Sequence, residues 1–590
     1  MKHMCLFPFD AASVGSTPDP RNNKANQACY SCRKQKRKCD KALPSCALCA
    51  RMSRFCDYSE TPPNPTVEDM AALKGRLVEL ENKLEEVRHS SASISPPAEE
   101  FYRESYPPMC PSVESWEQGT QNFDPTVFLD AKLFRDTGLS ITRPIVTIPP
   151  EVLQCIGDTE QVQHLLTNYF VHIHPWFPLV RKRRINVSSS LWDNSPENNL
   201  LCMAMLLVAW QPTDNLLVTK NYLYFSAKQF STQLESAGVA SLPYLQALLL
   251  IALYEYGHGI YPAAWMTVGR CVRYADFIGL PSYKDSNSML GNCATWIDAE
   301  ERRRTWWAVY VLDKVICLGS DKRPLCGEPA GNEILPVPDE AWDSGDASLA
   351  SQHTVMSPRT EFQSPFARLC QAALLLSKAL RHCQRAKLLR LQHKPPDDSE
   401  AASLLEGALD LAALSQREIS NHPVRYFSAL PSVCLAYSAV FKIVTIHLPG
   451  SAPETAPAAA YEDPSWTSRN HTSAQLAAYE ARKEVMERMH DVVRDIGACA
   501  SHQDGLNQIS PFVLDAVYYT GVTGAWWRDP CGLETIQKAL ARIGDRWAVA
   551  VQYGGLLQQH DIAAVSSSNF SMPMASMPMV PSVPSTTMAL

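Results

Sequence analysis

From the sequence we expect no segment that carries the protein into or across a membrane. Its 590 residues contain no apolar run that we judge long enough to span a bilayer, and the longest we identify lies around 200–210. The stretch after Lys2 is too short for a secretory signal and is broken by Pro8 and Asp10. We therefore expect an intracellular protein with no membrane partner, in which a cysteine framework is not a set of disulfides.

Common catalytic signatures are missing as well. The sequence has no nucleophile elbow, no phosphate-binding loop and no zinc-protease helix. His172 and His174 with Glu255 and His258 could be imagined as a metal or acid–base site. Alternating histidines beside a Pro-Trp-Phe-Pro turn are, however, more often packed structural residues. We therefore predict that the protein is not an enzyme and has no catalytic residues.

What the chain does contain is a cysteine repeat near its start. Cys29, Cys32 and Cys39 reappear 17 residues later. Each half is a C-x2-C followed by six residues and a third cysteine, and we expect a turn to supply two thiolates and a short helix to deliver the third. The second half of the repeat supplies Cys46, Cys49 and Cys56.

Three ligands per half leave each tetrahedral zinc ion one ligand short. Six thiolates complete two sites only if two sulfurs bridge both metals, and the symmetric choice is Cys29 and Cys46. A single zinc ribbon would leave Cys39 and Cys56 without a role, and an iron–sulfur cluster usually has a closer third cysteine. The spacing therefore predicts two zinc ions held by six cysteines.

Charge separates the two halves. From Cys29 to Cys56 there are eight Lys and Arg against one acid, a net charge of +7, while the whole chain carries −7 and the remainder therefore −14. Six thiolates and two zinc ions lower the charge of the metallated module to about +5. A compact basic module on an acidic body suggests a polyanion as partner of the module alone. Most of its positive charge lies in the first half, in the run Arg33, Lys34, Gln35, Lys36, Arg37 and Lys38.

These residues resemble the fungal binuclear zinc cluster transcription factors, whose motif is two C-x2-C-x6-C halves joined by a loop. Pro44 stands where that family carries its loop proline. The resemblance implies that the first helix enters the major groove, typically at CGG triplets, with a base-reading lysine four residues after the second cysteine. Lys36 occupies that position.

The chemistry of guanine agrees with this role. Its O6 and N7 accept hydrogen bonds in the major groove, and a Lys head at a helix start can donate to both. We expect Arg33, Lys34, Arg37 and Lys38 to contact mainly phosphates. Gln35 stands where many family members have a second basic residue, and it could prefer adenine or face solvent.

A heptad pattern follows the cluster. Apolar residues recur three and four apart at Met70, Leu73, Leu77, Leu80, Leu84 and Val87. This a/d seam favours a short parallel coiled coil over 67–88 and a homodimer, although a single amphipathic helix on its own domain stays an alternative. The Pro-rich linker 59–66 would then set the spacing of the two half-sites.

The rest of the chain is read from composition and periodicity. We expect disorder over 1–24, a cluster domain over 25–58, a disordered tether over 89–145, and a disordered Ser/Met/Pro-rich tail over 565–590. Apolar residues at helical spacing predict a large all-α domain over 150–560. Its segments 169–178, 264–280 and 302–324 resemble the helical middle homology region of the same fungal family, which implies a regulatory role. Trp176, Trp265, Trp306 and Trp307 could line a pocket, but their helical spacing favours the core.

We therefore expect a nuclear, DNA-binding transcription regulator. The resemblance implies a dimeric activator of a metabolic or secondary-metabolite gene set that contacts the transcription machinery, with a small-molecule effector as a further partner. The rival hypothesis is a zinc-organised protein-interaction module that reads no specific DNA. Charge reversal at Lys36 would leave the function of such a module intact.

Overall fold

The computed structural model describes residues 24–25, 27–58, 76, 126–136, 144–156, 159–184, 195–212, 221–280, 289–320, 322–448, 471–527 and 530–569. The chain divides into two compact units, 1–109 and 110–590. The described part contains helices and two isolated β-bridges but no strand, which confirms the predicted combination of a small cysteine module and a large all-α domain.

The first unit contains the cysteine repeat. Its helices α1 (Tyr30–Lys34) and α2 (Ala47–Arg51) are five residues long, and one bridge joins Lys24 to Ala42. The predicted coiled coil over 67–88 lies outside the described residues except for Arg76, which is helical.

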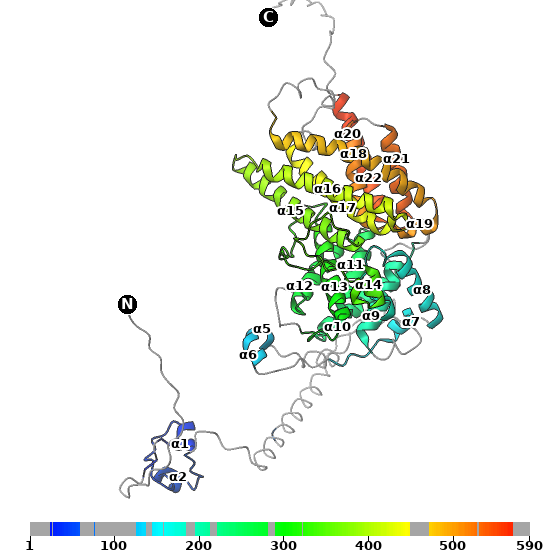
Figure 1. The fold of residues 1–590 in the computed structure, drawn as a ribbon. Helices are drawn as coiled ribbons and strands as arrows, with labels where there is room; N and C mark the ends of the chain where they lie inside the picture. The colour runs from blue at the N-terminus through cyan, green and yellow to red at the C-terminus, as the bar shows by residue number, and fades with distance from the viewer. Residues whose placement is uncertain are drawn as a thin grey trace, which may run out of the picture. The chain divides into compact units, whose positions relative to one another are not determined.

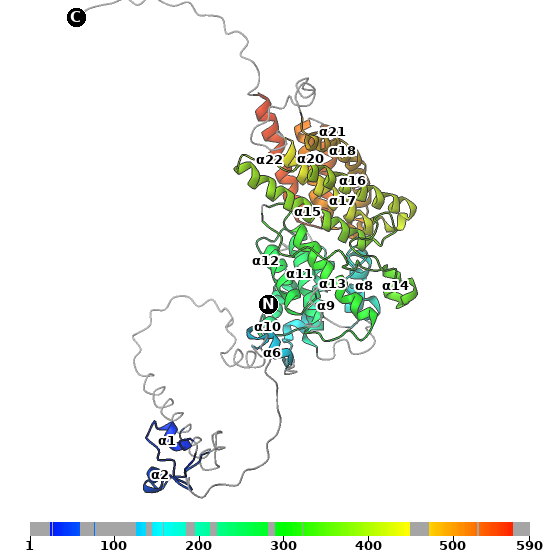
Figure 2. The same ribbon diagram turned by 60° about the vertical axis from the view of Figure 1, so that its left-hand side comes forward.

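The second unit consists of packed helices, drawn from cyan to red in Figure 1. The views in Figures 1 and 2 show α7–α14 gathered in one half and α15–α22 in the other. The first half contains α7 (Pro150–Ile156), α8 (Thr159–His172), α9 (Pro196–Ala209), α10 (Tyr222–Ser236), α11 (Leu242–Gly257), α12 (Ala263–Phe277), α13 (Trp296–Val315) and α14 (Asp339–Ser344). The second contains α15 (Pro365–Leu391), α16 (Asp398–Asn421), α17 (Tyr426–His447), α18 (Ser473–Ala500), α19 (Gln503–Gln508), α20 (Leu514–Trp527), α21 (Pro530–Gly544) and α22 (Val549–Asn569).

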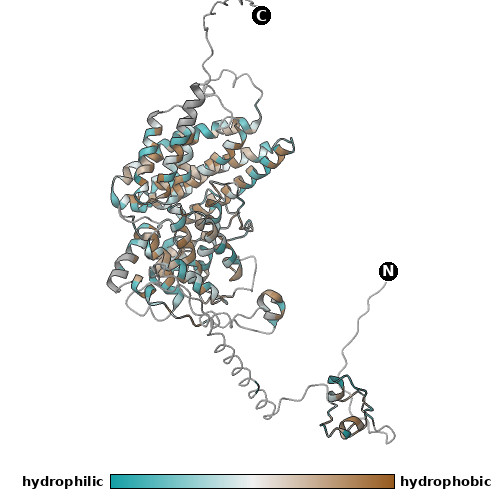
Figure 3. Cartoon of the chain, turned by 180° about the vertical axis from the view of Figure 1, so that it is seen from behind, coloured by the Kyte–Doolittle hydropathy of each residue, from teal (hydrophilic) through white to brown (hydrophobic). Residues whose placement is uncertain are grey.

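Three helices form the centre of this unit. Every residue of 199–208 in α9 and of 244–257 in α11 is buried, and α17 is buried along most of its length. A helix that is apolar on all sides must be surrounded, so amphipathic helices cover them with one face each, as α16 and α18 do for α17 and α12 does for α11. Figure 3 shows the resulting mixture of apolar and polar stretches along the surrounding helices.

One stretch of the described chain, Pro423–His447, is long and apolar enough to cross a membrane. Its most apolar window is 89% buried inside the domain, as expected for the core helix of a packed domain. This helix is not the apolar run at 200–210 that the sequence singled out as the longest. Ser432, Ser438 and Lys442 interrupt the apolar run in this helix. Its mean hydropathy nevertheless stays high enough for a membrane-spanning segment.

Two ranges differ from the expected domain limits. The predicted tether 89–145 contains α5 (Thr126–Leu129) and α6 (Ala131–Asp136), and the ring of Phe128 stacks on Phe277 of α12 with centroids 5.8 Å apart. Burial of an aromatic face against α12 gives this part of the tether a reason to be ordered. At the other end, α22 continues to Asn569, inside the predicted tail.

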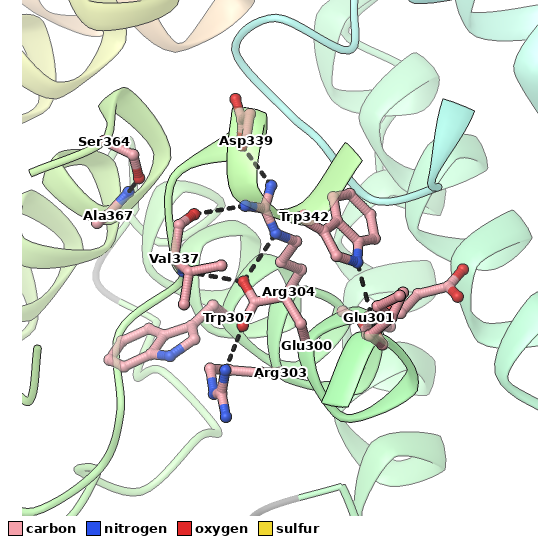
Figure 4. Close-up of polar contacts among 12 residues, drawn as sticks. Glu300, Glu301, Arg303, Arg304, Trp307, Val337, Asp339, Trp342, Ser364 and Ala367 are labelled. Atoms are coloured by element: carbon pink, nitrogen blue, oxygen red, sulfur yellow. Dashed lines mark hydrogen bonds and ion pairs between the residues drawn. The ribbon is translucent and has the colours of Figure 1, made fainter. Parts of the chain in front are cut away.

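A buried charge network ties α13 to the segment before α14 (Figure 4). Arg304 donates from Nε to Glu300 Oε1 at 2.9 Å, from Nη1 to Asp339 at 2.5 Å and from Nη2 to the Val337 carbonyl at 2.6 Å. Its guanidinium also lies 4.3 Å from the ring centroid of Trp342. Glu300 in turn accepts the Val337 N–H at 2.9 Å, so the network fixes side chains and backbone together.

Arg304→Ala is therefore expected to lower the free energy of unfolding by about 3–5 kcal/mol, because it removes a fully buried cation that pairs with both Glu300 and Asp339 and leaves Glu300 to Arg303 and the Val337 N–H. Urea denaturation followed by circular dichroism measures the change. Lys538→Ala is the control, since Lys538 pairs with Glu534 at an exposed site, and it should leave the unfolding transition unchanged. Equal effects of the two substitutions would contradict the structural role of the network.

Candidate metal centre and nucleic-acid interface

The six cysteines of the repeat converge on one small volume. The structure groups their sulfurs into two sets of four, each with all sulfurs within 4.8 Å of one another. One set is Cys29, Cys32, Cys39 and Cys46, and the other is Cys29, Cys46, Cys49 and Cys56. The two sets therefore share Cys29 and Cys46, the pair that symmetry selected in the sequence.

The spacing of the sulfurs suits zinc. Four sulfurs at about 2.3 Å from one tetrahedral zinc ion lie about 3.8 Å from each other. The Cys29 sulfur lies 3.8 Å from that of Cys46, 3.6 Å from that of Cys49 and 4.0 Å from that of Cys39. The shared sulfurs are also the most enclosed, because Cys29 and Cys46 are fully buried whereas Cys39 and Cys56 are half-buried. The donor set and its spacing therefore fit two zinc ions.

Burial favours the protonated thiol at the centre when no metal is bound. It raises the pKa of the Cys49 thiol to about 12, so that this sulfur is protonated at neutral pH without metal. Zinc binding to such a site displaces protons and couples metal affinity to folding of the module.

The backbone repeats along with the cysteines. In each half the first cysteine is the N-cap, the second lies inside the five-residue helix, and the helix ends two residues later. The Arg33 N–H bonds the Cys29 carbonyl at 3.0 Å, and the equivalent bond from Ala50 to Cys46 is 2.9 Å. The third cysteine follows in a non-helical segment, so the prediction that a helix delivers it is wrong.

Each helix ends in a Schellman motif whose left-handed residue is not glycine. Lys36 has φ +49° and Ser53, 17 residues later, has φ +50°. The motif is closed in the first half by N–H bonds from Lys36 to Arg33 and from Arg37 to Cys32. Lys36 therefore lies just past the C-terminal end of α1. The expectation that its head stands at a helix start is wrong. Glycine is the usual signal for this conformation, and its absence hid the motif.

The two halves also cap each other. The Ala47 N–H at the start of α2 donates to the Asp40 carboxylate at 3.1 Å, while the Tyr30 N–H at the start of α1 donates to the Asp57 carbonyl at 2.7 Å. Asp40 and Asp57 each follow the third cysteine of the opposite half. The loop that joins the halves contains a cis peptide bond before Pro44.

All six side chains of the run 33–38 are exposed. Arg33 donates to Gln27 at 2.6 Å, and Gln35 accepts from Arg54 of the second half at 2.7 Å. The Gln35 side chain is therefore hydrogen-bonded to a basic neighbour within the module. The sequence suggested instead that it prefers adenine or faces solvent. The other four side chains of the run form no hydrogen bond or ion pair with the described part of the chain. They are Lys34, Lys36, Arg37 and Lys38.

The second half presents a different surface. At the positions that follow α2 it exposes the apolar side chains of Met52 and Phe55, which are 50% and 81% exposed. The shared backbone therefore carries a basic surface on one half and a more apolar one on the other. An electropositive surface of this kind attracts a polyanion.

The imagined histidine site does not form. His174 packs against Tyr169, Phe170 and Trp342, whereas His258 packs against Trp210, Tyr254 and Trp547. Burial lowers the pKa of both imidazoles well below the usual value and keeps them neutral. Glu255 pairs instead with Lys228 and Tyr224. Trp176, Trp306 and Trp307 are core residues as expected, while Trp265 is only partly buried.

Known families match both units. Residues 27–65 match the fungal Zn(2)-Cys(6) binuclear cluster domain, and residues 166–405 match the fungal specific transcription factor domain. The second match extends past residue 324, where the last of the three resembling segments ends.

Curated relatives agree with these matches. Transcription factor BOA15 of Botryotinia fuckeliana (strain B05.10) is 35% identical over 182 residues, which is 30% of this chain and 97% of that protein. The citrinin biosynthesis transcriptional activator mrl3 of Monascus ruber is 24% identical over 63% of this chain and 75% of its own length. The depudecin biosynthesis cluster-specific transcription activator DEP6 of Fusarium langsethiae is 26% identical over 53% of this chain and 60% of its own length. The chain thus belongs to the fungal Zn(2)-Cys(6) family of DNA-binding transcription regulators, which are not enzymes and carry two zinc ions in their cluster.

Proposed function

We propose that this chain is a dimeric transcription activator that reads CGG-like triplets in duplex DNA and controls a secondary-metabolite biosynthetic gene set. The observation that carries the proposal is the exposed basic run 33–38, which a metal-organised scaffold holds in a fixed shape. Relatives named as activators of citrinin and depudecin biosynthesis support the gene class and the sign of regulation. A DNA-binding regulator acts in the nucleus, and we propose that location for this chain.

Within the basic run we assign Lys36 to guanine and its neighbours to phosphates. The left-handed conformation of Lys36 directs its side chain from the exposed end of α1, where no described residue competes for its ammonium group. Guanine O6 and N7 are the matching acceptors. Arg33, Lys34, Arg37 and Lys38 would neutralise backbone phosphates, so affinity should fall steeply with salt.

For the metal centre we propose that Cys29 and Cys46 bridge the two zinc ions. Cys32 and Cys39 would complete one site, and Cys49 and Cys56 the other. The support is the sharing of Cys29 and Cys46 between the two sulfur sets.

The domain limits and the dimer are proposed from the sequence patterns described above. We propose domain limits of 25–58 for the cluster and 150–560 for the regulatory domain, a linker over 59–66, and a homodimer through 67–88, where the heptad seam lies. A cluster that touches a few base pairs makes too small a contact for high specificity, so doubling the site is physically reasonable. The regulatory domain would bind a small-molecule effector and present the activation function to the transcription machinery.

Replacing a bridging cysteine should weaken zinc binding more than replacing a cysteine that binds only one zinc ion. Cys46→Ser removes a ligand shared by both sites, whereas Cys39→Ser removes a ligand from one site. We expect about two zinc ions per chain in the wild type, and release from Cys46→Ser at a lower chelator concentration than from Cys39→Ser. Native mass spectrometry with stepwise chelator measures this. Earlier release from Cys39→Ser would contradict the bridging assignment.

Lys36→Gly separates reading of DNA from folding of the module. Glycine suits the left-handed position, so the cluster should keep its zinc and its fold. Loss of the ammonium group should weaken binding to a duplex with paired CGG triplets by about 1–3 kcal/mol. Fluorescence anisotropy at fixed salt measures the change.

Ser53→Gly is the matched control, because it makes the same backbone change at the equivalent position of the second half. We expect it to bind DNA as the wild type does. If Lys36→Gly also bound as the wild type does, the base-reading role would be refuted and the protein-interaction hypothesis would gain support.

A further inference from the structure

A cleft of about 650 Å³ lies along α12, outside the metal centre. The α12 residues Trp265, Gly269, Tyr274 and Phe277 line it, together with Leu325 from the loop after α13 and Phe128 from α5. This volume is within the range of small-molecule sites, and a mostly apolar lining with a few polar groups is typical of them.

Hydrogen bonds hold parts of its wall in place. The Tyr274 hydroxyl donates to the Val239 carbonyl at 2.7 Å and accepts the Ser241 N–H at 2.9 Å. The Leu325 N–H donates to the buried carboxylate of Asp313 at 2.9 Å, which fixes the loop that carries the Leu325 side chain. The cleft is therefore a preformed hollow rather than a gap between mobile side chains.

The lining is unusually apolar for exposed surface. Phe128 is 69% exposed, Met266 57% and Leu325 48%, and all three border the cleft. Exposed apolar side chains gathered at one concave site indicate a binding surface. Phe277 stacks on Phe128 and Tyr274 packs against Tyr244, so the rings of Trp265 and Phe128 supply the flat faces on which an aromatic ligand can pack.

Gly269 keeps the floor of the cleft open. It lies inside α12, where glycine is less favourable than alanine by about 0.5–1 kcal/mol. A Cβ atom built there would meet Leu325 Cδ1 at 3.6 Å, an ordinary contact. A larger residue at this position would therefore occupy the part of the cleft next to Leu325 without disturbing the helix.

The charge at the rim is positive. Arg270 is matched by Glu235, with which it forms an ion pair, and it also donates to the Tyr244 hydroxyl at 3.1 Å. Arg273 is exposed and has no ion pair among the described residues. The ammonium group of Lys322 lies 5.2 Å from the ring centroid of Trp265 and adds a second cation at the same edge. The rim therefore favours an anionic group.

We propose that this cleft binds a planar aromatic acid, with its rings packed against Trp265 and Phe128 and its carboxylate at Arg273. This proposal rests on the proposed function, in which the regulatory domain binds a small-molecule effector, and it gives that effector a site and a chemical class. Phe128 belongs to α5, which lies between the cluster and the regulatory domain in the sequence. A ligand in the cleft contacts Phe128 and so fastens that segment to α12.

The test measures binding of anthracenecarboxylate and of the matched cation aminomethylanthracene to the full-length protein without DNA, by isothermal titration calorimetry. We expect the acid to bind roughly tenfold or more tightly than the amine. Arg273→Glu should reverse that preference. Protection of 126–136 from hydrogen exchange should rise when the acid is bound and stay unchanged with the amine.

Gly269→Leu puts a side chain into the cleft between Trp265 and Leu325 and should abolish binding of the acid while the melting temperature stays the same or rises. Gly497→Leu makes the same change in α18, where a Cβ meets nothing within 4 Å, and should leave binding intact. Equal affinity for acid and amine, no binding of either, or full binding by Gly269→Leu would overturn the proposal. Because DNA is absent from the assay, these results are independent of whether the cluster reads CGG triplets.

Discussion

The sharing of two sulfurs by two metal sites is the constraint on which the DNA-binding unit depends. Six cysteines provide eight tetrahedral positions only if Cys29 and Cys46 each serve twice. This forces the N-caps of α1 and α2 together and leaves the exposed ends of both helices pointing outward from a buried centre. A module of about thirty residues is too small to fold on apolar burial alone, so the metal centre takes the place of a core.

On that symmetric frame the two halves have diverged. Their helices, caps and left-handed residues correspond one to one at a separation of 17 residues, as Lys36 and Ser53 do. The side chains differ, with a basic run on the first half and Met52 and Phe55 on the second. The two halves therefore share one backbone, while the basic charge is concentrated on the first.

Sequence reasoning succeeded where one residue type carries the signal and failed where the signal is conformational. Cysteine spacing alone predicted the six ligands and the shared pair, and helical periodicity predicted the all-α body. It misplaced Lys36 because a left-handed residue without glycine has no sequence mark. It missed α5 because Phe128 is ordered by a distant partner, Phe277, and it could not separate Trp265 from the core tryptophans. The cleft along α12 combines residues from 128 to 325, a set that no local pattern reveals.

The central claim is that the metal-organised basic run reads specific bases. Selection of random duplex DNA by the full-length protein, with zinc present and after chelation, tests it most directly. The account predicts enrichment of paired CGG-like triplets at a fixed spacing, lost on chelation. Salt-sensitive retention of DNA without any enriched sequence would contradict it and leave only a basic patch on a zinc scaffold.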